Sequence, residues 1–127
     1  LKSLLNKNGI IVLQIITIKD NAFDYYKKNP DFIQKHIFPG GMLPSIDIIK
    51  KILENNKLKI IENNNYPDHY AKTLNNWRNN FNSSLDEIRN NGFDDRFIRL
   101  WNYYLAYCES GFKTKRINLN QIKIMHN

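Results

Sequence analysis

The pattern of apolar and polar positions predicts three strands separated by helices. Residues 10–18 (IIVLQIITI) are apolar almost without interruption, which is typical of a strand buried on both faces of a sheet. Residues 57–62 and 115–125 alternate between apolar and polar positions, which indicates two further strands. Helical patterns lie between the strands, so the sequence predicts an α/β fold.

Helix boundaries are marked by proline, serine and glycine. Residues 21–37 have a helical pattern that Asn29-Pro30 divides into two pieces, because proline removes a backbone donor and restricts the residue before it. The segment 37–45 (IFPGGMLPS) is expected to be a loop. Ser45 is expected to cap a helix that ends near Asn56.

Two long helices are predicted at about 68–91 and 94–112, each with one apolar stripe that we expect to be buried. The first stripe contains Tyr70, Leu74, Trp77, Phe81, Leu85 and Ile88. The second contains Phe97, Trp101, Tyr104, Cys108 and Phe112.

A sheet of three strands is small for a strand as apolar as residues 10–18. Such a strand needs neighbours on both sides, whereas the other two can cover only one of its edges. Proteins normally cover a long, apolar sheet edge. The pattern therefore predicts that the chain is part of a larger sheet.

Composition and charge leave several functions open. Of 127 residues, 42% are hydrophobic and 24% charged, which excludes a disordered or collagen-like chain. The net charge of +7 favours an anionic partner, either nucleic acid or an anionic lipid surface. A bias toward Lys, Asn and Ile can also produce that charge. The apolar run at 10–18 falls far short of the roughly 20 residues that a membrane-spanning helix needs.

The common catalytic motifs are absent. The sequence has no G-x-G-x-x-G, no Walker loop, no G-x-S-x-G and no H-E-x-x-H. Its three histidines are far apart and it has one cysteine, Cys108, so we expect no metal site. Because Cys108 lies on an apolar stripe, a buried and inert thiol is expected rather than a nucleophile.

Two features fit either packing or ligand binding. Tyr70 lies in the first turn of a predicted helix, after Pro67 and Asp68, where free N–H groups and the helix dipole favour an anion. Its phenol can donate to such an anion, although periodicity alone favours a core tyrosine. Tyr104 and Cys108 are one helical turn apart, and they fit either the core or the wall of an apolar pocket for a chain-like ligand.

Three strings in order carry a family resemblance: DFIQKHIFPGGMLPS (31–45), PDHYAKTL (67–74) and GFDDRFIRLWNYYLAYCESGF (92–112). Together they resemble the C-terminal part of cyclopropane-fatty-acyl-phospholipid synthases, a family that includes the mycolic acid cyclopropane synthases. The resemblance implies a class I S-adenosylmethionine-dependent methyltransferase fold with a Rossmann-like, seven-stranded sheet. The strands predicted here would be the fifth, sixth and seventh, with the seventh between the other two.

The resemblance also implies an activity. Family members transfer a methyl group from S-adenosylmethionine to the cis double bond of a phospholipid acyl chain. The resulting cation loses a proton, for which a bound bicarbonate is the expected base. The implied partners are phospholipid acyl chains and an anionic membrane surface, with no nucleic acid. The implied location is cytoplasmic, at the inner face of the membrane.

Site residues follow from the resemblance position by position. Tyr70 and the backbone carbonyl of Ile16 match bicarbonate contacts. Gln14 stands where mycolate-type enzymes carry histidine; glutamine can still hydrogen-bond to bicarbonate but cannot become cationic. The positions that line the acyl-chain pocket match Phe38, Leu43, Leu74, Tyr104 and Cys108.

Other parts of the family pattern would precede residue 1. These are the glycine-rich S-adenosylmethionine loop, the acidic ribose-binding residue and a glutamate that contacts bicarbonate. We therefore expect residues 1–127 to be the C-terminal portion of one methyltransferase domain. We expect the chain to be inactive alone, either an enzyme half that needs an N-terminal fragment or an inactive remnant. The alternative is a small basic module that binds nucleic acid or anionic membrane; the aromatic stripes, expected to be buried, argue against it.

Overall fold

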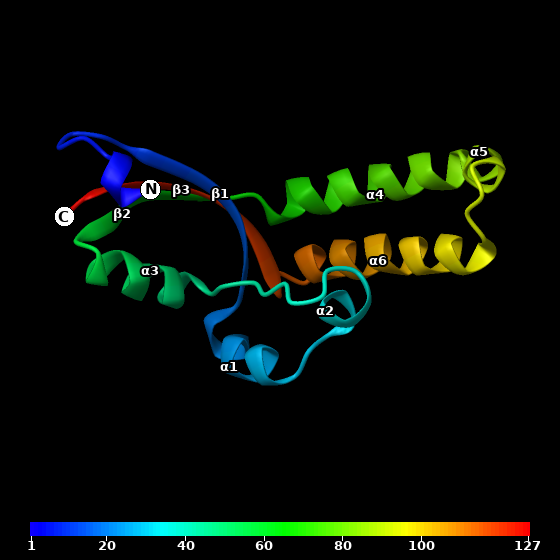
Figure 1. Cartoon of the computed structure of the whole chain (residues 1–127), viewed down its shortest axis with the longest axis horizontal. Coiled ribbons are helices and arrows are strands. Elements are labelled where there is room, and N and C mark those ends of the chain that lie inside the picture. Colours follow the sequence, from blue (N-terminus) through cyan, green and yellow to red (C-terminus); the bar gives the residue numbers. More distant parts are fainter. The chain divides into compact units, whose positions relative to one another are not determined.

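The computed structural model describes all 127 residues as two units. Unit 1 contains residues 1–66 and 116–127, and unit 2 contains residues 67–115. Figure 1 shows a sheet with short helices in the first and a helical hairpin in the second. The two units are described separately below.

The sheet of unit 1 has three strands, β1 (Ile11–Ile18), β2 (Leu58–Asn65) and β3 (Ile117–His126). Their order is β1-β3-β2, and β3 is antiparallel to both neighbours. This confirms the expected placement of the last strand between the other two. It also leaves β1 paired along one edge only.

The burial of β1 differs from the expectation. Only Thr17 and Ile18, at its C-terminal end, are buried, whereas Val12 is 68% exposed and Gln14 is exposed. The better-covered face of the sheet instead centres on β3, where Ile122 and Ile124 are fully buried. The apolar run therefore predicted the strand correctly but overestimated how much of it this chain covers.

The helices of unit 1 are a 3-10 turn at Lys2–Leu4, α1 (Asp20–Lys28), α2 (Phe32–His36) and α3 (Ile46–Asn55). The predicted break at Asn29-Pro30 separates α1 from α2. Ser45 caps α3 as expected, because its Oγ accepts a hydrogen bond of 3.4 Å from the Ile48 N–H. α3 packs against β2.

The loop between α2 and α3 begins with a tight turn at residues 38–41. The N–H of Gly41 donates to the carbonyl of Phe38 at 2.9 Å, and Gly40 has a φ of +81°. With Pro39 before Gly40, this is the pattern of a type II turn, in which the third residue needs positive φ and is usually glycine. Phe38 is displayed at its start, 56% exposed.

A small core holds this loop to α1. Ile18, Phe23 and Tyr26 are buried together, and Leu43 and Ile48 pack against them. The Tyr26 hydroxyl accepts a hydrogen bond of 3.3 Å from the N–H of Leu43. Burial raises the pKa of Tyr26, so its hydroxyl stays protonated at neutral pH. The end of the loop near Leu43 is therefore attached to α1.

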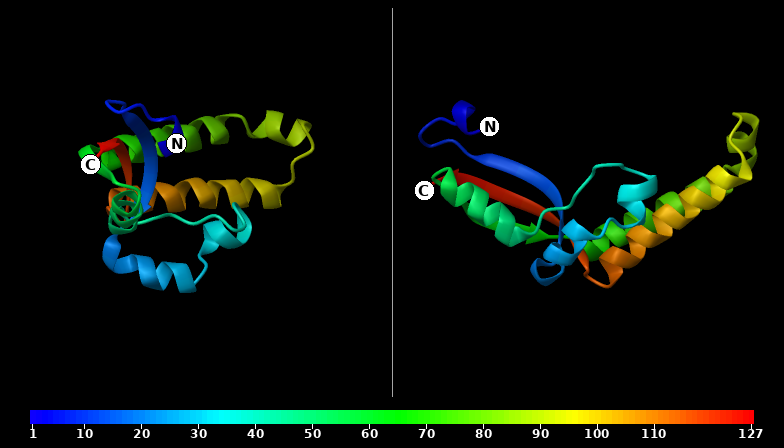
Figure 2. Two further views of the ribbon diagram at one scale, coloured as in Figure 1. Left: turned by 60° about the vertical axis from the view of Figure 1, so that its left-hand side comes forward. Right: turned by 60° about the horizontal axis from the view of Figure 1, so that its bottom comes forward.

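Unit 2 is a hairpin of α4 (Pro67–Ser83), α5 (Leu85–Asn90) and α6 (Asp95–Lys113). The long α4 and α6 lie side by side in every view (Figure 2). The prediction of a single helix over 68–91 is wrong. α4 ends at Ser83, and Ser84 leaves helical geometry (φ −109°, ψ 18°). Asp94 caps α6 by accepting from the Phe97 N–H at 2.8 Å.

The apolar stripes are less buried than predicted. The buried apolar residues of the hairpin are Ala71, Leu74, Ile98, Leu105 and Phe112. Trp77 is 48% exposed, and Phe97, Trp101, Tyr104 and Cys108 are half-buried. The line of contact between the helices thus runs beside the aromatic rows, and the rows form one side of the hairpin.

A buried amide fixes the register of β1 on β3. Asn120 is 1% exposed, and its Nδ2 donates to Thr17 Oγ1 at 2.7 Å. We expect Asn120→Ala to lower the free energy of unfolding of the 127-residue chain by about 1–3 kcal/mol, since it leaves a buried hydroxyl without its donor. Urea denaturation measures this. Gln121→Ala, at the exposed neighbouring position, is the control, and equal losses for both variants would contradict the role given to Asn120.

Candidate functional site

The residues that the sequence assigns to a site fall in both units. Unit 1 carries Gln14, Ile16, Phe38 and Leu43. Unit 2 carries Tyr70, Leu74, Tyr104 and Cys108. Each group is described within its own unit.

Gln14 and Ile16 share one face of β1, because they are two residues apart in a strand. Ile16 is half-buried opposite Leu119 of β3. Gln14 lies opposite Gln121, whose Nε2 donates to Gln14 Oε1 at 3.0 Å. This bond engages the carbonyl oxygen of Gln14 and does not involve its amide N–H groups. Gln14 can therefore donate to a small anion on this face.

The same face carries a polar pair that the sequence did not reveal. The Nδ2 of Asn64 donates to Glu62 Oε1 at 2.7 Å, and Lys123 Nζ lies 3.6 Å from Glu62 Oε2. The bond from Asn64, and then the charge of Lys123, lower the pKa of Glu62. The register places Asn64 opposite Gln121 and Glu62 opposite Lys123, so polar side chains cross all three strands next to Gln14.

Phe38 and Leu43 have different surroundings. The ring of Phe38 is largely exposed on the type II turn, whereas Leu43 is half-buried against Ile18, Phe23 and Tyr26. Leu43 thus belongs to the small core of α1, and Phe38 stands at the surface.

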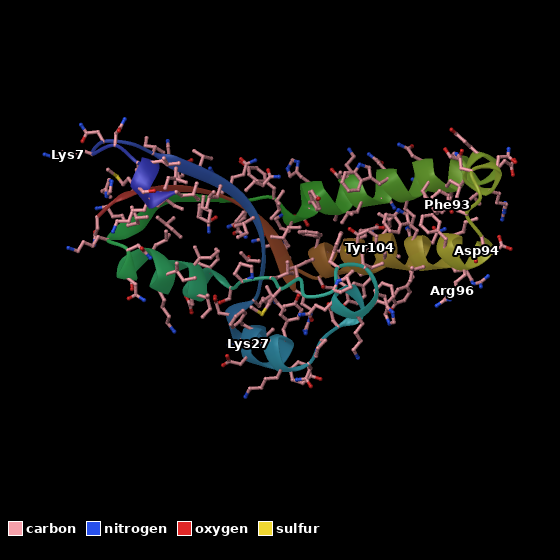
Figure 3. The ribbon with its side chains drawn as sticks, viewed as in Figure 1. Lys7, Lys27, Phe93, Asp94, Arg96 and Tyr104 are labelled. Carbon is pink, nitrogen blue, oxygen red and sulfur yellow. The ribbon has the colours of Figure 1, made fainter.

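In unit 2, aromatic rings cover one side of the hairpin. The Tyr70 ring lies 4.8 Å from the ring of Phe112 and 6.1 Å from that of Trp77 (centroid to centroid). From Phe93, just before α6, the rings of Phe93, Phe97, Trp101 and Tyr104 follow one another at 4.4, 5.5 and 5.2 Å (Phe93 and Tyr104 are labelled in Figure 3). This arrangement, which we call the aromatic side, contains rings from both expected stripes.

Three of the expected residues are neighbours on the aromatic side. Burial, together with nearby Cys108 and Tyr70, raises the pKa of Tyr104, so its phenol stays protonated and can only donate or accept a hydrogen bond at neutral pH. Tyr70 is half-buried in the first turn of α4, where the helix dipole favours an anion. The hairpin therefore brings two phenols and a thiol to one apolar surface.

The opposite side of the hairpin is held by charges and amides. Glu109 is 4% exposed; its carboxylate binds Arg78 at 3.2 Å, Asn75 at 3.3 Å and the ammonium of Lys113. Asn82 and Asn102 donate to each other's amide oxygens at 2.9 Å. Sequence reasoning missed Glu109, although its spacing four residues after buried Leu105 is a signal for a buried carboxylate.

The comparison with protein families identifies the chain. A family model described as mycolic acid cyclopropane synthetase matches residues 1–122. The chain belongs to this family. The match spans β1, the turn at Phe38, α4 with Tyr70 and α6 with Cys108, so it covers both units.

Individual relatives agree with this assignment. The tuberculostearic acid methyltransferase UfaA1 of Mycobacterium tuberculosis is 36% identical over 95% of the chain, and the cyclopropane-fatty-acyl-phospholipid synthase of Escherichia coli K12 is 30% identical over 93%. The chain spans 29% of the length of each. A crystal structure of the mycolic acid cyclopropane synthase CmaA1 complexed with SAH and CTAB matches 96% of the chain and 46% of its own length, with a TM-score of 0.83 and 24% identity.

These comparisons establish the fold class. The α/β unit with its three-stranded sheet corresponds to part of the sheet of S-adenosylmethionine-dependent methyltransferases. No helix of the chain is both long and apolar enough to cross a membrane. No three His, Cys, Asp or Glu side chains are grouped in a way that can hold a metal ion.

Glu109 gives the hairpin a predicted acid sensitivity. Lys113, followed by Asn75 and Arg78, lowers the pKa of Glu109 despite its burial. A carboxylate whose pKa is lowered in the folded state stabilises the fold at pH values above 4.5, its ordinary pKa. This stabilisation is lost as the pH falls through the lowered pKa. We expect Glu109→Gln to cost about 1.5–3 kcal/mol at neutral pH and progressively less in acid.

Denaturation curves at several pH values measure this dependence. The control is Asp86→Asn, since the Asp86 carboxylate is fully exposed and lies 3.9 Å from Arg89. Parallel stability–pH curves for the parent chain and Glu109→Gln would show that Glu109 does not stabilise the hairpin through its charge.

Proposed function

We propose that residues 1–127 form the C-terminal portion of a methyltransferase that methylates or cyclopropanates the cis double bond of phospholipid acyl chains. The family match across residues 1–122 carries the proposal. The names of two relatives, a tuberculostearic acid methyltransferase and a cyclopropane-fatty-acyl-phospholipid synthase, support the substrate class.

Besides an activated methyl donor, the chemistry requires two things of the protein: first a dry pocket, and second a well-placed base. An alkene is a weak nucleophile, so the reaction needs an activated methyl donor, which S-adenosylmethionine supplies as a sulfonium when it is bound. Methyl transfer leaves a carbocation, which water would capture, so the acyl chain needs a dry pocket. The cation must then lose one proton to one well-placed base.

The aromatic side of the hairpin meets the first requirement. Leu74 is buried, and Tyr104 and Cys108 are half-buried on neighbouring turns of α6. Leu74 is apolar, and the raised pKa of Tyr104 keeps its phenol uncharged at neutral pH. In the proposed enzyme these side chains of unit 2 contact the acyl chain and exclude water. Phe38 and Leu43 of unit 1 are proposed as acyl-chain contacts by resemblance alone.

The second requirement fits a bound bicarbonate. In unit 2, Tyr70 has a phenol in the first turn of α4 that can donate to a bicarbonate oxygen. In unit 1, the bond from Gln121 engages only the carbonyl oxygen of Gln14, so the Gln14 amide can also donate to such an anion, and the backbone carbonyl of Ile16 can accept from its hydroxyl. A bound bicarbonate would supply the base that takes the proton. Gln14 stays neutral throughout, so it can position the anion but adds no charge.

The cofactor-binding part is proposed to come from sequence upstream of residue 1. Residues 1–127 have no glycine-rich phosphate or cofactor loop, and they correspond to 29% of the two relatives' length. The N-terminal portion, or a separate N-terminal fragment, would supply the S-adenosylmethionine site and pair with the open edge of β1. The proposed location is the cytoplasmic face of an anionic membrane, where the substrate lies.

Titration calorimetry tests whether the S-adenosylmethionine site lies outside residues 1–127. The purified 127-residue chain should give no measurable heat of binding with S-adenosylmethionine, because the residues proposed to bind it are not in these 127. A dissociation constant close to that of a complete relative, measured in the same buffer, would show that the chain carries its own cofactor site.

A chimera tests the activity. The segment of UfaA1 that aligns with this chain is replaced by residues 1–122, and transfer of a labelled methyl group to phospholipid acyl chains is measured. We expect a folded, active chimera in which Tyr70→Phe lowers kcat by about 10²-fold or more, as expected for loss of a group that holds a general base. The control Tyr103→Phe removes an exposed phenol from the same hairpin.

The outcomes are separable. A chimera that folds, binds S-adenosylmethionine and transfers no methyl group would contradict the proposed function. An active chimera in which Tyr70→Phe and Tyr103→Phe behave alike would keep the function and remove Tyr70 from the site.

A further inference from the structure

We propose that Gln121 of β3 is a positioning residue that orients the Gln14 amide for bicarbonate binding. The two side chains face each other across β1 and β3, and Gln121 Nε2 donates to Gln14 Oε1 at 3.0 Å. The inference rests on the proposed function, since it takes Gln14 as a contact of the bound anion. It adds the residue that selects which end of the Gln14 amide the anion meets.

The two ends of a glutamine amide act in opposite ways on an anion. The carbonyl oxygen only accepts hydrogen bonds, whereas the NH2 group only donates them. A half-turn about the last side-chain bond exchanges the two ends and leaves the shape of the side chain almost unchanged. Gln14 can therefore attract or repel a bicarbonate from the same position, and a neighbour that binds one end selects between the two.

The bond from Gln121 supplies this selection. It engages the carbonyl oxygen of Gln14, so the NH2 group of Gln14 is the end that remains available to an anion. If Gln14 alone made the half-turn, its NH2 group would meet the NH2 group of Gln121 and the bond would be lost. Side chains directly opposite in an antiparallel pair are close neighbours, so Gln121 is well placed to impose this orientation.

The pair contributes direction rather than stability. Gln14 and Gln121 are both exposed, and a bond between exposed neutral side chains replaces bonds to water with little net gain. The register of β1 on β3 is already fixed by the buried bond between Asn120 and Thr17. Changes at Gln121 can therefore test the orientation of Gln14 without removing a contact on which the sheet depends.

The neighbours on β2 leave Gln121 to act on Gln14. Asn64 lies opposite Gln121, but its Nδ2 donates to Glu62 Oε1 at 2.7 Å. The carboxylate of Glu62 also lies 3.6 Å from Lys123 Nζ, so these two charges compensate each other. A neutral donor thus stands between the charged pair and Gln14, and it is the donor that sets the orientation of the Gln14 amide.

The UfaA1 chimera described above tests the role, because it contains both glutamines. Methyl transfer is measured in CO2-depleted buffer with added bicarbonate, and the concentration that gives half the maximal rate is determined. Gln121→Met keeps the length of the side chain and removes the donor. We expect it to raise this concentration about two- to tenfold, as expected for loss of one neutral hydrogen bond, with the KM for S-adenosylmethionine unchanged.

Gln121→Glu reverses the hydrogen-bonding role at the same length. Its carboxylate only accepts, so Gln14 would turn its NH2 group toward it and present the carbonyl oxygen to the anion. We expect the half-saturating bicarbonate concentration to rise at least about tenfold, more than in Gln121→Met. In a Gln14→His background the same change should cost less, because an imidazole donates to the carboxylate and its pKa rises beside that charge. A purely structural loss would not depend on residue 14 in this way.

Asn64→Leu is the matched control. It exchanges an exposed amide for an apolar side chain on the same face, one strand further from Gln14, and it should leave the bicarbonate dependence unchanged. Circular dichroism checks that every variant keeps its fold.

Amide NMR of the 127-residue chain gives a second readout that needs no activity. In Gln121→Glu the side-chain NH2 signals of Gln14 should shift as this group binds the new carboxylate. In Asn64→Leu these signals should stay where they are in the parent chain.

The positioning role is overturned if Gln121→Met and Asn64→Leu behave alike. It is also overturned if Gln121→Glu needs no more bicarbonate than the parent, or leaves the Gln14 NH2 signals in place. Methyl transfer that is independent of bicarbonate would remove the role and leave the proposed methyltransferase standing. A folded chimera that binds S-adenosylmethionine and is inactive at every bicarbonate concentration would contradict the proposed function, and the NMR comparison would then decide the orientation of Gln14 separately.

Discussion

The insertion of β3 between β1 and β2 is the constraint on which the rest of unit 1 depends. β1 and β2 are separated by about forty residues, and each pairs only with β3. Ile122 and Ile124 of β3 are the most buried side chains of the sheet, and the amide of Asn120 sets its register through Thr17. Because side chains alternate along a strand, a slip of one residue would move Gln14 and Ile16 to the other face. The geometry of the candidate site therefore begins with this pairing.

The hairpin achieves its geometry by a different means. A buried carboxylate is costly unless it is paired, and Glu109 has Arg78, Lys113 and Asn75 around it. With the Asn82–Asn102 amide pair, these contacts hold the polar side of α4 against α6. The aromatic residues are left on the other side, half-exposed, where an apolar ligand can be covered. Polar contacts on one side thus preserve an apolar surface on the other.

The sequence predicted the features that depend on local chemistry. Pro30, Ser45 and Asp94 act on their own neighbours, so the break after α1 and the starts of α3 and α6 were recognisable. The features that were missed depend on distant partners. Glu109 meets Arg78 on another helix, Gln14 meets Gln121 across more than a hundred residues, and the exposure of Trp77 follows from where α6 lies. The family resemblance gave the strand order, which periodicity alone left open.

The difference between the apolarity and the burial of β1 has a physical meaning. Ile10 and Val12 are 52% and 68% exposed, and one edge of the strand has no partner. Leaving such a strand exposed is unfavourable and invites pairing with another chain. A further strand along this edge would satisfy the free backbone groups and, with covering helices, would bury Val12. It would also enclose the face that carries Gln14 and Ile16, which the proposed proton transfer requires to be dry. The same strand thus connects the unpaired edge of the sheet with the exposure of the face that carries Gln14.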